Sequence, residues 1–211
     1  MPTTPKKKRR RRIPERRVLD ANKAELRINE QDGKRRVEGY AAVYNSPSVD
    51  LGGFTEVLEP GCFDDCLAAG PDVFALYNHE PDAVLARNTS GTLSLSLDER
   101  GLAYSFDMPD TTLGRDLAEL MARGDIHGSS FAFISDKAEF RKEDGKSVRY
   151  IQKVRELVDV SVVTTPAYPA AGSAIRSFKR WQKSQEIVTE IPEELLAHLA
   201  MLRLRAQRTK L

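Results

Sequence analysis

The 211-residue chain lacks any apolar run of 18 residues, which argues against a membrane-spanning helix. Its charged N-terminus has no apolar stretch behind it, so the pattern of a secretory signal is also missing. Cysteine is scarce: Cys62 and Cys66 lie four positions apart, a helical spacing that makes a disulfide between them geometrically poor. No second pair of ligands completes a zinc site. These absences predict a cytosolic protein with reduced thiols, no metal, no cofactor and no membrane contact.

Net charge is also small, at +2, although the ends of the chain are strongly basic. Seven consecutive Lys and Arg residues occupy positions 6–12, and the region after Phe178 is again basic and rich in helix formers. The charges are therefore segregated, and the middle of the chain should be comparatively acidic. We expect a basic, disordered tail over 1–20, a folded domain over 21–177, and a linker with an amphipathic helix over 178–211.

The expected C-terminal helix covers Glu194–Gln207. Leu195, Leu196, Leu199 and Leu202 form one apolar face, and a linker of polar residues precedes them. Such a stripe is typical of a segment that docks on its own domain or on a partner.

Hydrophobic periodicity predicts an α+β fold with a β-rich core. Leu93, Leu95 and Leu97 alternate with polar residues, and a second alternating run follows over 102–108, as in an antiparallel hairpin with one buried face. The period then changes: Leu113, Leu117 and Leu120 recur at helical spacing. Strand patterns resume over 129–140 and 148–163. We expect two or three helices around a sheet that closes, or nearly closes, into an antiparallel barrel.

Three residue types together suggest hydrolytic chemistry. His79 follows an apolar strand, Ser129 and Ser130 follow Gly128, and Asp159 lies in an apolar strand. An imidazole that takes the proton of a weak hydroxyl nucleophile, and is itself oriented by a carboxylate, is the arrangement of serine hydrolases. His127 and His198 are weaker candidates for the base. Each of these residues also has an ordinary structural role open to it, as a capping histidine, a strand-edge hydroxyl or a salt-bridge partner.

Two roles in the candidate site, the nucleophile and the carboxylate, each have two candidate residues. Strand alternation places Ser130 with small neighbours, which favours it as the nucleophile, and Ser129 is its rival. Gly128 is expected to allow a sharp turn through a positive φ. A carboxylate among apolar residues must be paired or hydrogen-bonded, and Asp159 and Glu156 are the two candidates for the third member; strand alternation places them on opposite faces.

Several segments in chain order resemble the HK97-type phage prohead (capsid maturation) proteases. The likeness runs from about Val37 to Ala174. It is carried by short motifs, each weak alone but specific as an ordered series: Gly39-Tyr40-Ala41-Ala42-Val43-Tyr44-Asn45-Ser46-Pro47, Leu51-Gly52-Gly53-Phe54-Thr55-Glu56, Pro60-Gly61-Cys62-Phe63-Asp64, Asn78-His79, Ser90-Gly91-Thr92-Leu93, Gly114-Arg115-Asp116-Leu117, Ser130-Phe131 and Asp159-Val160-Ser161-Val162-Val163-Thr164-Thr165-Pro166-Ala167-Tyr168-Pro169.

This resemblance implies a serine endopeptidase, and a fold like that of herpesvirus assemblin. His79 matches the base of the family and Ser130 its nucleophile. The chain departs from the family in having Ser129 where methionine is frequent, and Asp159 where glutamate is frequent.

The implied substrates are the scaffolding segment of the major capsid protein and then the protease itself, inside the prohead in the host cytoplasm. The portal protein and a second copy of the chain are further candidate partners. The C-terminal helix is expected to target the protease to the shell and to be removed by self-cleavage.

A different class of function stays open, in which the chain is a non-catalytic assembly factor that binds scaffold through its basic ends. Contact between the N-terminal run and nucleic acid is only weakly suggested. A core stripe of aromatic and basic residues, which single-strand binders need, is absent from the sequence.

Overall fold

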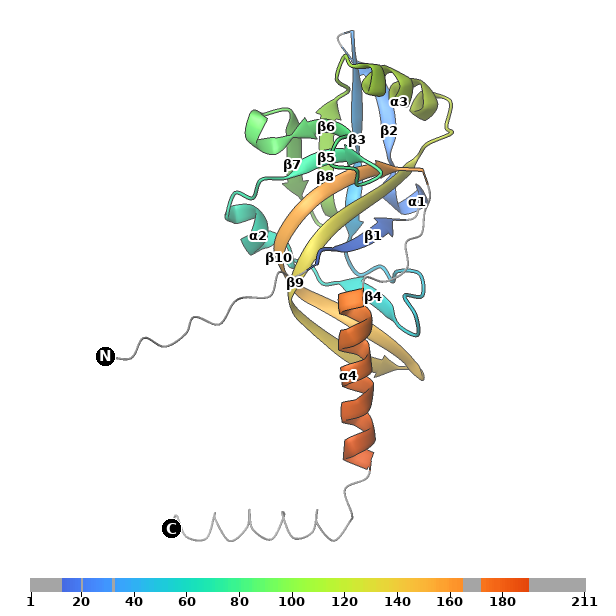
Figure 1. Cartoon of the computed structure of the whole chain (residues 1–211), viewed down its shortest axis with the longest axis vertical. Helices are drawn as coiled ribbons and strands as arrows, with labels where there is room; N and C mark the ends of the chain where they lie inside the picture. Colours follow the sequence, from blue (N-terminus) through green and yellow to red (C-terminus); the bar gives the residue numbers. More distant parts are fainter. Residues whose placement is uncertain (1–12, 20, 32, 165–171, 190–211) are drawn as a thin grey trace, which may run out of the picture. The chain divides into compact units, whose positions relative to one another are not determined.

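The computed structural model describes residues 13–19, 21–31, 33–164 and 172–189 (Figure 1). The chain divides into two compact units, Met1–Ile175 and Arg176–Leu211. The first unit contains two β-sheets, and helix α4 (Gly172–Thr189) spans the boundary between the units. Within the described ranges, no helix is long and apolar enough to cross a membrane.

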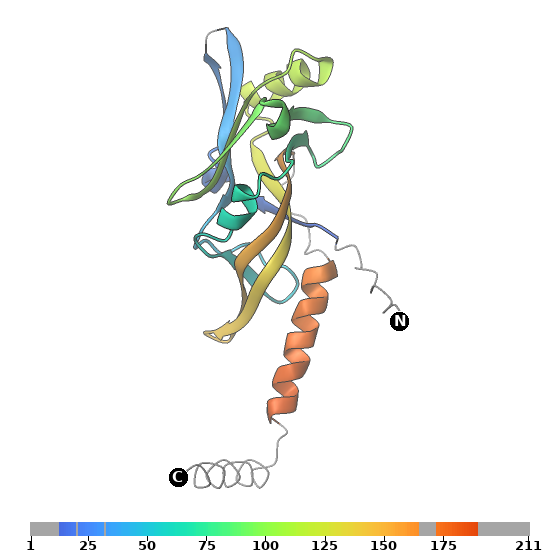
Figure 2. The same ribbon diagram turned by 90° about the vertical axis from the view of Figure 1, so that its left-hand side faces the viewer.

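The larger sheet has six strands and is mixed. Its path runs β1-β9-β10-β5-β6, and β4 pairs separately with β10. β10 is antiparallel to β9 but parallel to β4 and β5, and Figure 2 shows β9 and β10 as one long curved hairpin. The strands are β1 (Glu15–Leu19), β4 (Thr55–Leu58), β5 (Phe74–Tyr77), β6 (Val84–Arg87), β9 (Gly128–Glu143) and β10 (Lys146–Val163).

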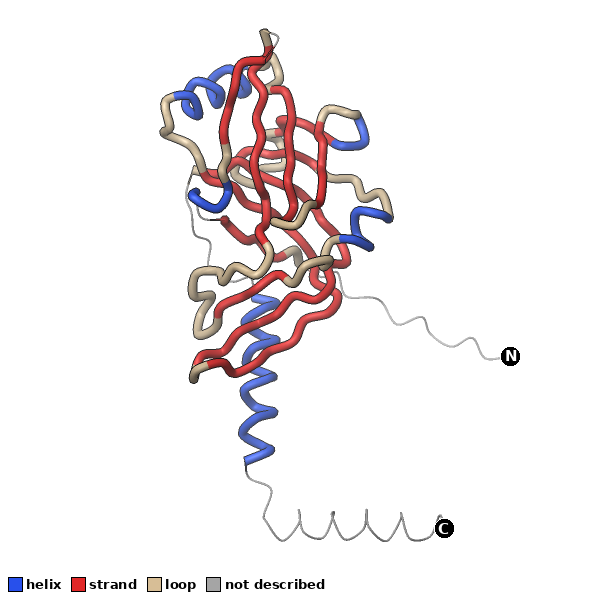
Figure 3. The backbone as a smooth tube through the Cα atoms, turned by 180° about the vertical axis from the view of Figure 1, so that it is seen from behind, coloured by secondary structure: helices blue, strands red, loops and turns tan. Residues whose placement is uncertain are grey.

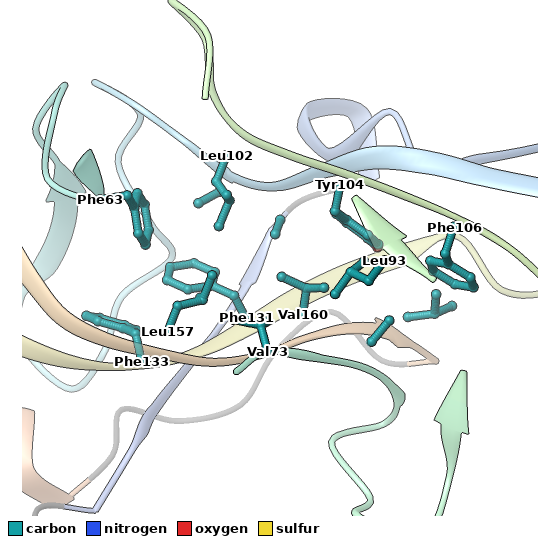
Figure 4. Close-up of a cluster of buried hydrophobic side chains, with 14 of the residues drawn as sticks. Phe63, Val73, Leu93, Leu102, Tyr104, Phe106, Phe131, Phe133, Leu157 and Val160 are labelled. Atoms are coloured by element: carbon teal, nitrogen blue, oxygen red, sulfur yellow. The ribbon is translucent and has the colours of Figure 1, made fainter. Parts of the chain in front are cut away.

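The smaller sheet has four antiparallel strands in the order β2-β3-β8-β7, which run side by side in Figure 3. These strands are β2 (Arg27–Gln31), β3 (Lys34–Val43), β7 (Leu93–Leu97) and β8 (Gly101–Asp107). As the alternating pattern predicted, Leu102, Tyr104 and Phe106 of β8 are buried. They meet Phe131 and Phe133 of β9 in a common core (Figure 4).

Among the described residues, the helices other than α3 and α4 are short. They are α1 (Ala21–Ala24), α2 (Asp64–Ala68), α3 (Thr112–Ala122) and α4, with a 3-10 turn η1 at Asn88–Ser90. The hydroxyl of Thr111 caps α3 by accepting a hydrogen bond from the Gly114 N–H at 3.0 Å. Gly124, with φ of 81°, follows the last turn of α3, so a capping hydroxyl begins this helix and a glycine follows its end.

The sheets differ from the expected barrel. Over the described residues the strands form two separate sheets and neither closes, so the closed antiparallel barrel is not confirmed. The larger sheet ends at β1 and β6 and the smaller at β2 and β7, and no strand pairing within the described residues joins these edges. β10 also has β4 and β5 as parallel partners, so the larger sheet is not antiparallel throughout.

Both ends of the folded domain also differ from expectation. The basic tail expected over 1–20 ends in an ordered strand, because β1 adds to the edge of β9. α4 occupies part of the polar stretch expected to be a linker, and its Phe178 and Trp181 rings stack 6.0 Å apart. The predicted helix Glu194–Gln207 lies outside the described residues.

The buried core leads to a prediction about the stability of a variant in which one core side chain is shortened. Leu102 is fully buried, so Leu102→Ala should lower the free energy of unfolding by about 2–5 kcal/mol, since a cavity replaces the lost contacts. Val84→Ala is the matched control, because Val84 is 42% exposed. Urea unfolding followed by circular dichroism measures both. A loss below about 1 kcal/mol for Leu102→Ala would show that this side chain is not in the core.

Candidate active site

Three neighbouring strands bring the candidate residues together. β10 lies between β9, which carries Ser130, and β5, which ends just before His79. Ser161 of β10 is opposite Ser130 in the antiparallel pair and opposite Leu76 in the parallel pair. Asp159, two residues earlier on β10, therefore lies on the same side of the strand, close to both neighbours.

His79 is held in an uncommon backbone conformation. Asn78 and His79 have φ of 54° and 58°, the left-handed region that asparagine tolerates better than most residues. The backbone N–H of Asn78 donates a hydrogen bond to the Val162 carbonyl oxygen at 2.9 Å. The side-chain oxygen of Asn78 accepts a hydrogen bond from the Thr164 N–H at 3.0 Å. These bonds tie the turn to the end of β10. Positive φ at a site residue is a common form of local strain that the surrounding structure stabilises.

The side chains form a continuous hydrogen-bonded chain. His79 Nε2 is 2.6 Å from Ser130 Oγ, and His79 Nδ1 is 2.6 Å from Asp159 Oδ1. The carboxylate oxygen accepts, so Nδ1 carries the proton and Nε2 of the neutral ring is left as an acceptor for the Ser130 hydroxyl. Such an arrangement can remove a proton from the hydroxyl while the carboxylate stabilises the resulting imidazolium.

A fourth residue, Ser161, was missed by the sequence analysis. Its hydroxyl donates to Asp159 Oδ1 at 2.7 Å and its Oγ is 3.2 Å from His79 Nδ1. Ser161 therefore holds the carboxylate to which the imidazole is hydrogen-bonded. Its position two residues after Asp159, on the same face of a strand, was the available signal.

The alternatives are placed elsewhere. Ser129 faces the other sheet, where its hydroxyl is 3.1 Å from the buried Tyr104 hydroxyl. Glu156 is exposed and lies opposite Ile134, whereas Asp159 is 5% exposed and lies opposite Ala132. His127 is an exposed residue whose Nδ1 lies 3.1 Å from the Gly124 carbonyl. His198 lies outside the described residues. Geometry thus brings together His79, Ser130 and Asp159.

Gly128 is needed for a different reason from the one expected. Its φ is not positive, and it is the first residue of β9 rather than part of a sharp turn. A Cβ at this position would lie 2.7 Å from the Val163 carbonyl oxygen. Glycine therefore permits the close approach of β9 and β10 beside the candidate site.

An apolar pocket of about 560 Å³ opens next to these residues. His79 and Asp159 line it, with Phe74, Leu76 and Ala132 from the sheet and Ile13 from the segment before β1. Concave apolar surface with a few polar groups is typical of binding sites for side chains or small ligands.

A buried cluster of ion pairs connects β1 with β4 and β10 of the same sheet. Arg17 of β1 binds Glu56 of β4 through two hydrogen bonds of 2.8 and 2.9 Å. Arg149 of β10 binds Glu15 of β1 at 2.6 Å and Glu56 at 2.8 Å. Burial alone would raise the pKa of Glu15, but the hydrogen bonds and charges of Arg149 and Arg17 outweigh it and lower the pKa.

Both cysteines are free and buried. Burial, reinforced by the nearby carboxylate of Asp64, raises the pKa of Cys62 to about 12, so its reactive thiolate is strongly disfavoured. Within the described ranges, no group of three or more His, Cys, Asp or Glu residues is arranged to hold a metal ion.

Comparison with known proteins identifies the family. The model of the caudovirus prohead serine protease family matches residues 22–184. No curated protein matches the chain. Among solved structures, the bacteriophage T4 capsid assembly protease, gp21, matches with 10% identity and a TM-score of 0.44, over 72% of this chain and 99% of that chain. The family model covers well over half of the sequence, and the chain therefore belongs to the caudovirus prohead serine protease family.

Proposed function

We propose that this member of the family is a serine endopeptidase that cuts the scaffolding segment of the major capsid protein, and then itself, inside the prohead in the host cytoplasm. The observation that carries the proposal is the hydrogen-bonded chain from Ser130 through His79 to Asp159, with 2.6 Å at each step. Membership of a protease family supports the reaction class independently of this geometry.

Each residue has a distinct role in the proposed mechanism. His79 Nε2 takes the Ser130 proton as Oγ attacks the scissile carbonyl carbon, and Asp159 stabilises the imidazolium. The imidazolium then donates its proton to the leaving amine, which departs and leaves an acyl-enzyme. Water, activated by His79, hydrolyses this ester and restores Ser130. Backbone N–H groups between Ser129 and Phe131 are the candidate donors to the oxyanion.

The nucleophile assignment makes the first prediction. Ser130→Ala should lower peptidase activity by about four orders of magnitude or more and abolish labelling by a fluorophosphonate probe. Ser129→Ala, the matched control one residue away, should still be labelled at Ser130. It should be less stable by about 1–3 kcal/mol, because the buried Tyr104 hydroxyl loses its partner. Peptide mapping by mass spectrometry locates the label, and thermal unfolding measures the stability.

Two results would contradict the assignment. Labelling of Ser129 in the unsubstituted chain would transfer the nucleophile to the rival serine. Absence of peptidase activity from both the Ser130→Ala and the unsubstituted chain would favour the non-catalytic assembly factor.

The positioning role of Ser161 makes a second prediction. Ser161→Ala should lower kcat about tenfold with little change in KM, since a hydrogen bond to a charged group is worth about 1.5–3 kcal/mol and only part of it acts on the transition state. Ser161→Thr keeps the hydroxyl that donates to Asp159 and should restore most of the rate. Steady-state kinetics on a peptide substrate measures both parameters. A rise in KM at constant kcat, or no rescue by threonine, would show that the hydroxyl does not act through Asp159.

The C-terminal region makes a third prediction, because we propose that it targets the protease to the assembling shell. Deleting residues 180–211 should greatly reduce the amount of protease in purified proheads, while peptidase activity in solution is kept. Quantitative mass spectrometry of proheads, with Ser130→Ala as the full-length control that does not process itself, makes the comparison. Incorporation of the shortened chain at the control level would contradict the targeting role.

A further inference from the structure

The half of β9 that is distant from the candidate site has an open edge. β10 pairs with one side of β9 along its length, whereas β1 pairs with the other side only over Ser129–Phe133. Among the described residues, no strand pairs with this outer side from Ile134 to Glu143, and this half of the hairpin extends past β1 in Figure 1. An open edge presents backbone N–H and C=O groups with which a strand of another chain can pair.

This edge has few of the features that block such pairing. Proline, short length and bulges protect many edge strands. The segment Ile134–Glu143 contains neither proline nor glycine, and its register with β10 is regular from Ala138 to Glu143. Charged side chains protect an edge when like charges would meet across the new pair. The charges along this edge therefore decide which strand can add to it.

The charged side chains of the edge share one face. Arg141 Nη2 and Glu139 Oε2 are 3.1 Å apart, and the Arg141 guanidinium lies 4.3 Å from the centroid of the Tyr150 ring. The Tyr150 hydroxyl donates a hydrogen bond to Glu143 at 2.7 Å. These contacts agree with strand alternation, which puts four charged residues on this face: Lys137, Glu139, Arg141 and Glu143. The side chains of Glu139 and Arg141 are 53% and 41% exposed, so both can meet a charge on a second strand.

The order of these charges is complementary to itself. When two copies of one strand pair antiparallel about a two-fold axis, one residue lies at the axis and the residues on either side of it face each other. An axis at Phe140 places Glu139 of each copy opposite Arg141 of the other. The same axis places Lys137 opposite Glu143. Opposite charges thus meet at each of these positions, and such cross-strand pairs stabilise a sheet.

The neighbouring registers lack this match. An axis at Glu139 places two glutamates against each other and Lys137 opposite Arg141. An axis at Arg141 places two arginines against each other and Glu139 opposite Glu143. An axis at Ala138 keeps the single match of Lys137 with Glu139. Because like charges directly opposite each other destabilise a sheet, the pattern selects the register centred on Phe140.

We propose that two copies of the chain associate through the distal edge of β9, the segment Lys137–Glu143, in an antiparallel pair centred on Phe140. The larger sheet then continues from one copy into the other. This association goes beyond the proposed function, and measuring it needs no catalysis.

Reversal of one charge, and then exchange of two, tests the pairing. Sedimentation equilibrium of the full-length chain, with Ser130→Ala to keep it intact, measures the dimer dissociation constant. The dimer should weaken as salt is raised, because exposed charges are screened. Glu139→Arg should weaken it about tenfold, since two attractive contacts become repulsive. Glu139→Arg/Arg141→Glu makes the charges complementary again and should restore the affinity.

The matched control is Glu38→Arg, which reverses one charge of the exposed ion pair with Arg27 on the other sheet and should leave the dissociation constant unchanged. A monomer at every salt concentration would overturn the proposal. Failure of Glu139→Arg/Arg141→Glu to recover the affinity lost in Glu139→Arg would overturn it as well.

Cysteine cross-linking tests the register independently. Ala138 and Lys142 are exposed, and each faces the other residue of the second copy when the axis lies at Phe140. Under mild oxidation, Ala138→Cys/Lys142→Cys should form a disulfide-linked dimer. Each single variant should stay uncross-linked, and an equimolar mixture of the two should cross-link. The native Cys62 and Cys66 are buried. Non-reducing electrophoresis gives the result, and single variants that cross-link as readily as the double variant would refute this register.

Discussion

β10 pairs with β9 on one side and with β5 on the other, and this double pairing sets the distances within the candidate site. The antiparallel register places Ser161 opposite Ser130, and the parallel register places it opposite Leu76, three residues before His79. A shift of one residue in either pairing would turn Asp159 to the opposite face of the sheet or move it away from the imidazole. Gly128 permits the close contact of β9 and β10, and Asn78 fixes the histidine turn to the end of β10.

The same sheet buries the candidate nucleophile beside its edge strand. Ser130 lies on the strand next to the sheet edge, and the edge strand is supplied by the chain's own N-terminal region.

Local patterns in the sequence predicted much of the fold. Alternation over 92–108 marked β7 and β8, and the helical spacing of Leu113, Leu117 and Leu120 marked α3. β6 was missed because its four residues, Val84–Arg87, are too few to show a period. β1 was missed because its basic composition resembles a solvated tail, and its partner on β9 is more than a hundred residues away. Closure of the sheet depends on such distant pairings, which one sequence does not encode in a readable local pattern.

The candidate site was predictable to a similar degree. Residue types and the family resemblance pointed to His79, Ser130 and Asp159, and the choice against Ser129 and Glu156 depends on which face of a strand each side chain occupies. Strand alternation could suggest that choice, but the irregular register of β10 between Leu157 and Asp159 makes counting unreliable there. Ser161 and the edge position of β1 required the tertiary structure.

The most direct test of the account is the intact mass of protease and major capsid protein over time, when the two are expressed together. We predict that both proteins shorten with the unsubstituted protease and that both stay full length with Ser130→Ala. If both proteins stay intact with either protease, or are trimmed alike with both, Ser130 is not the nucleophile of a prohead maturation protease.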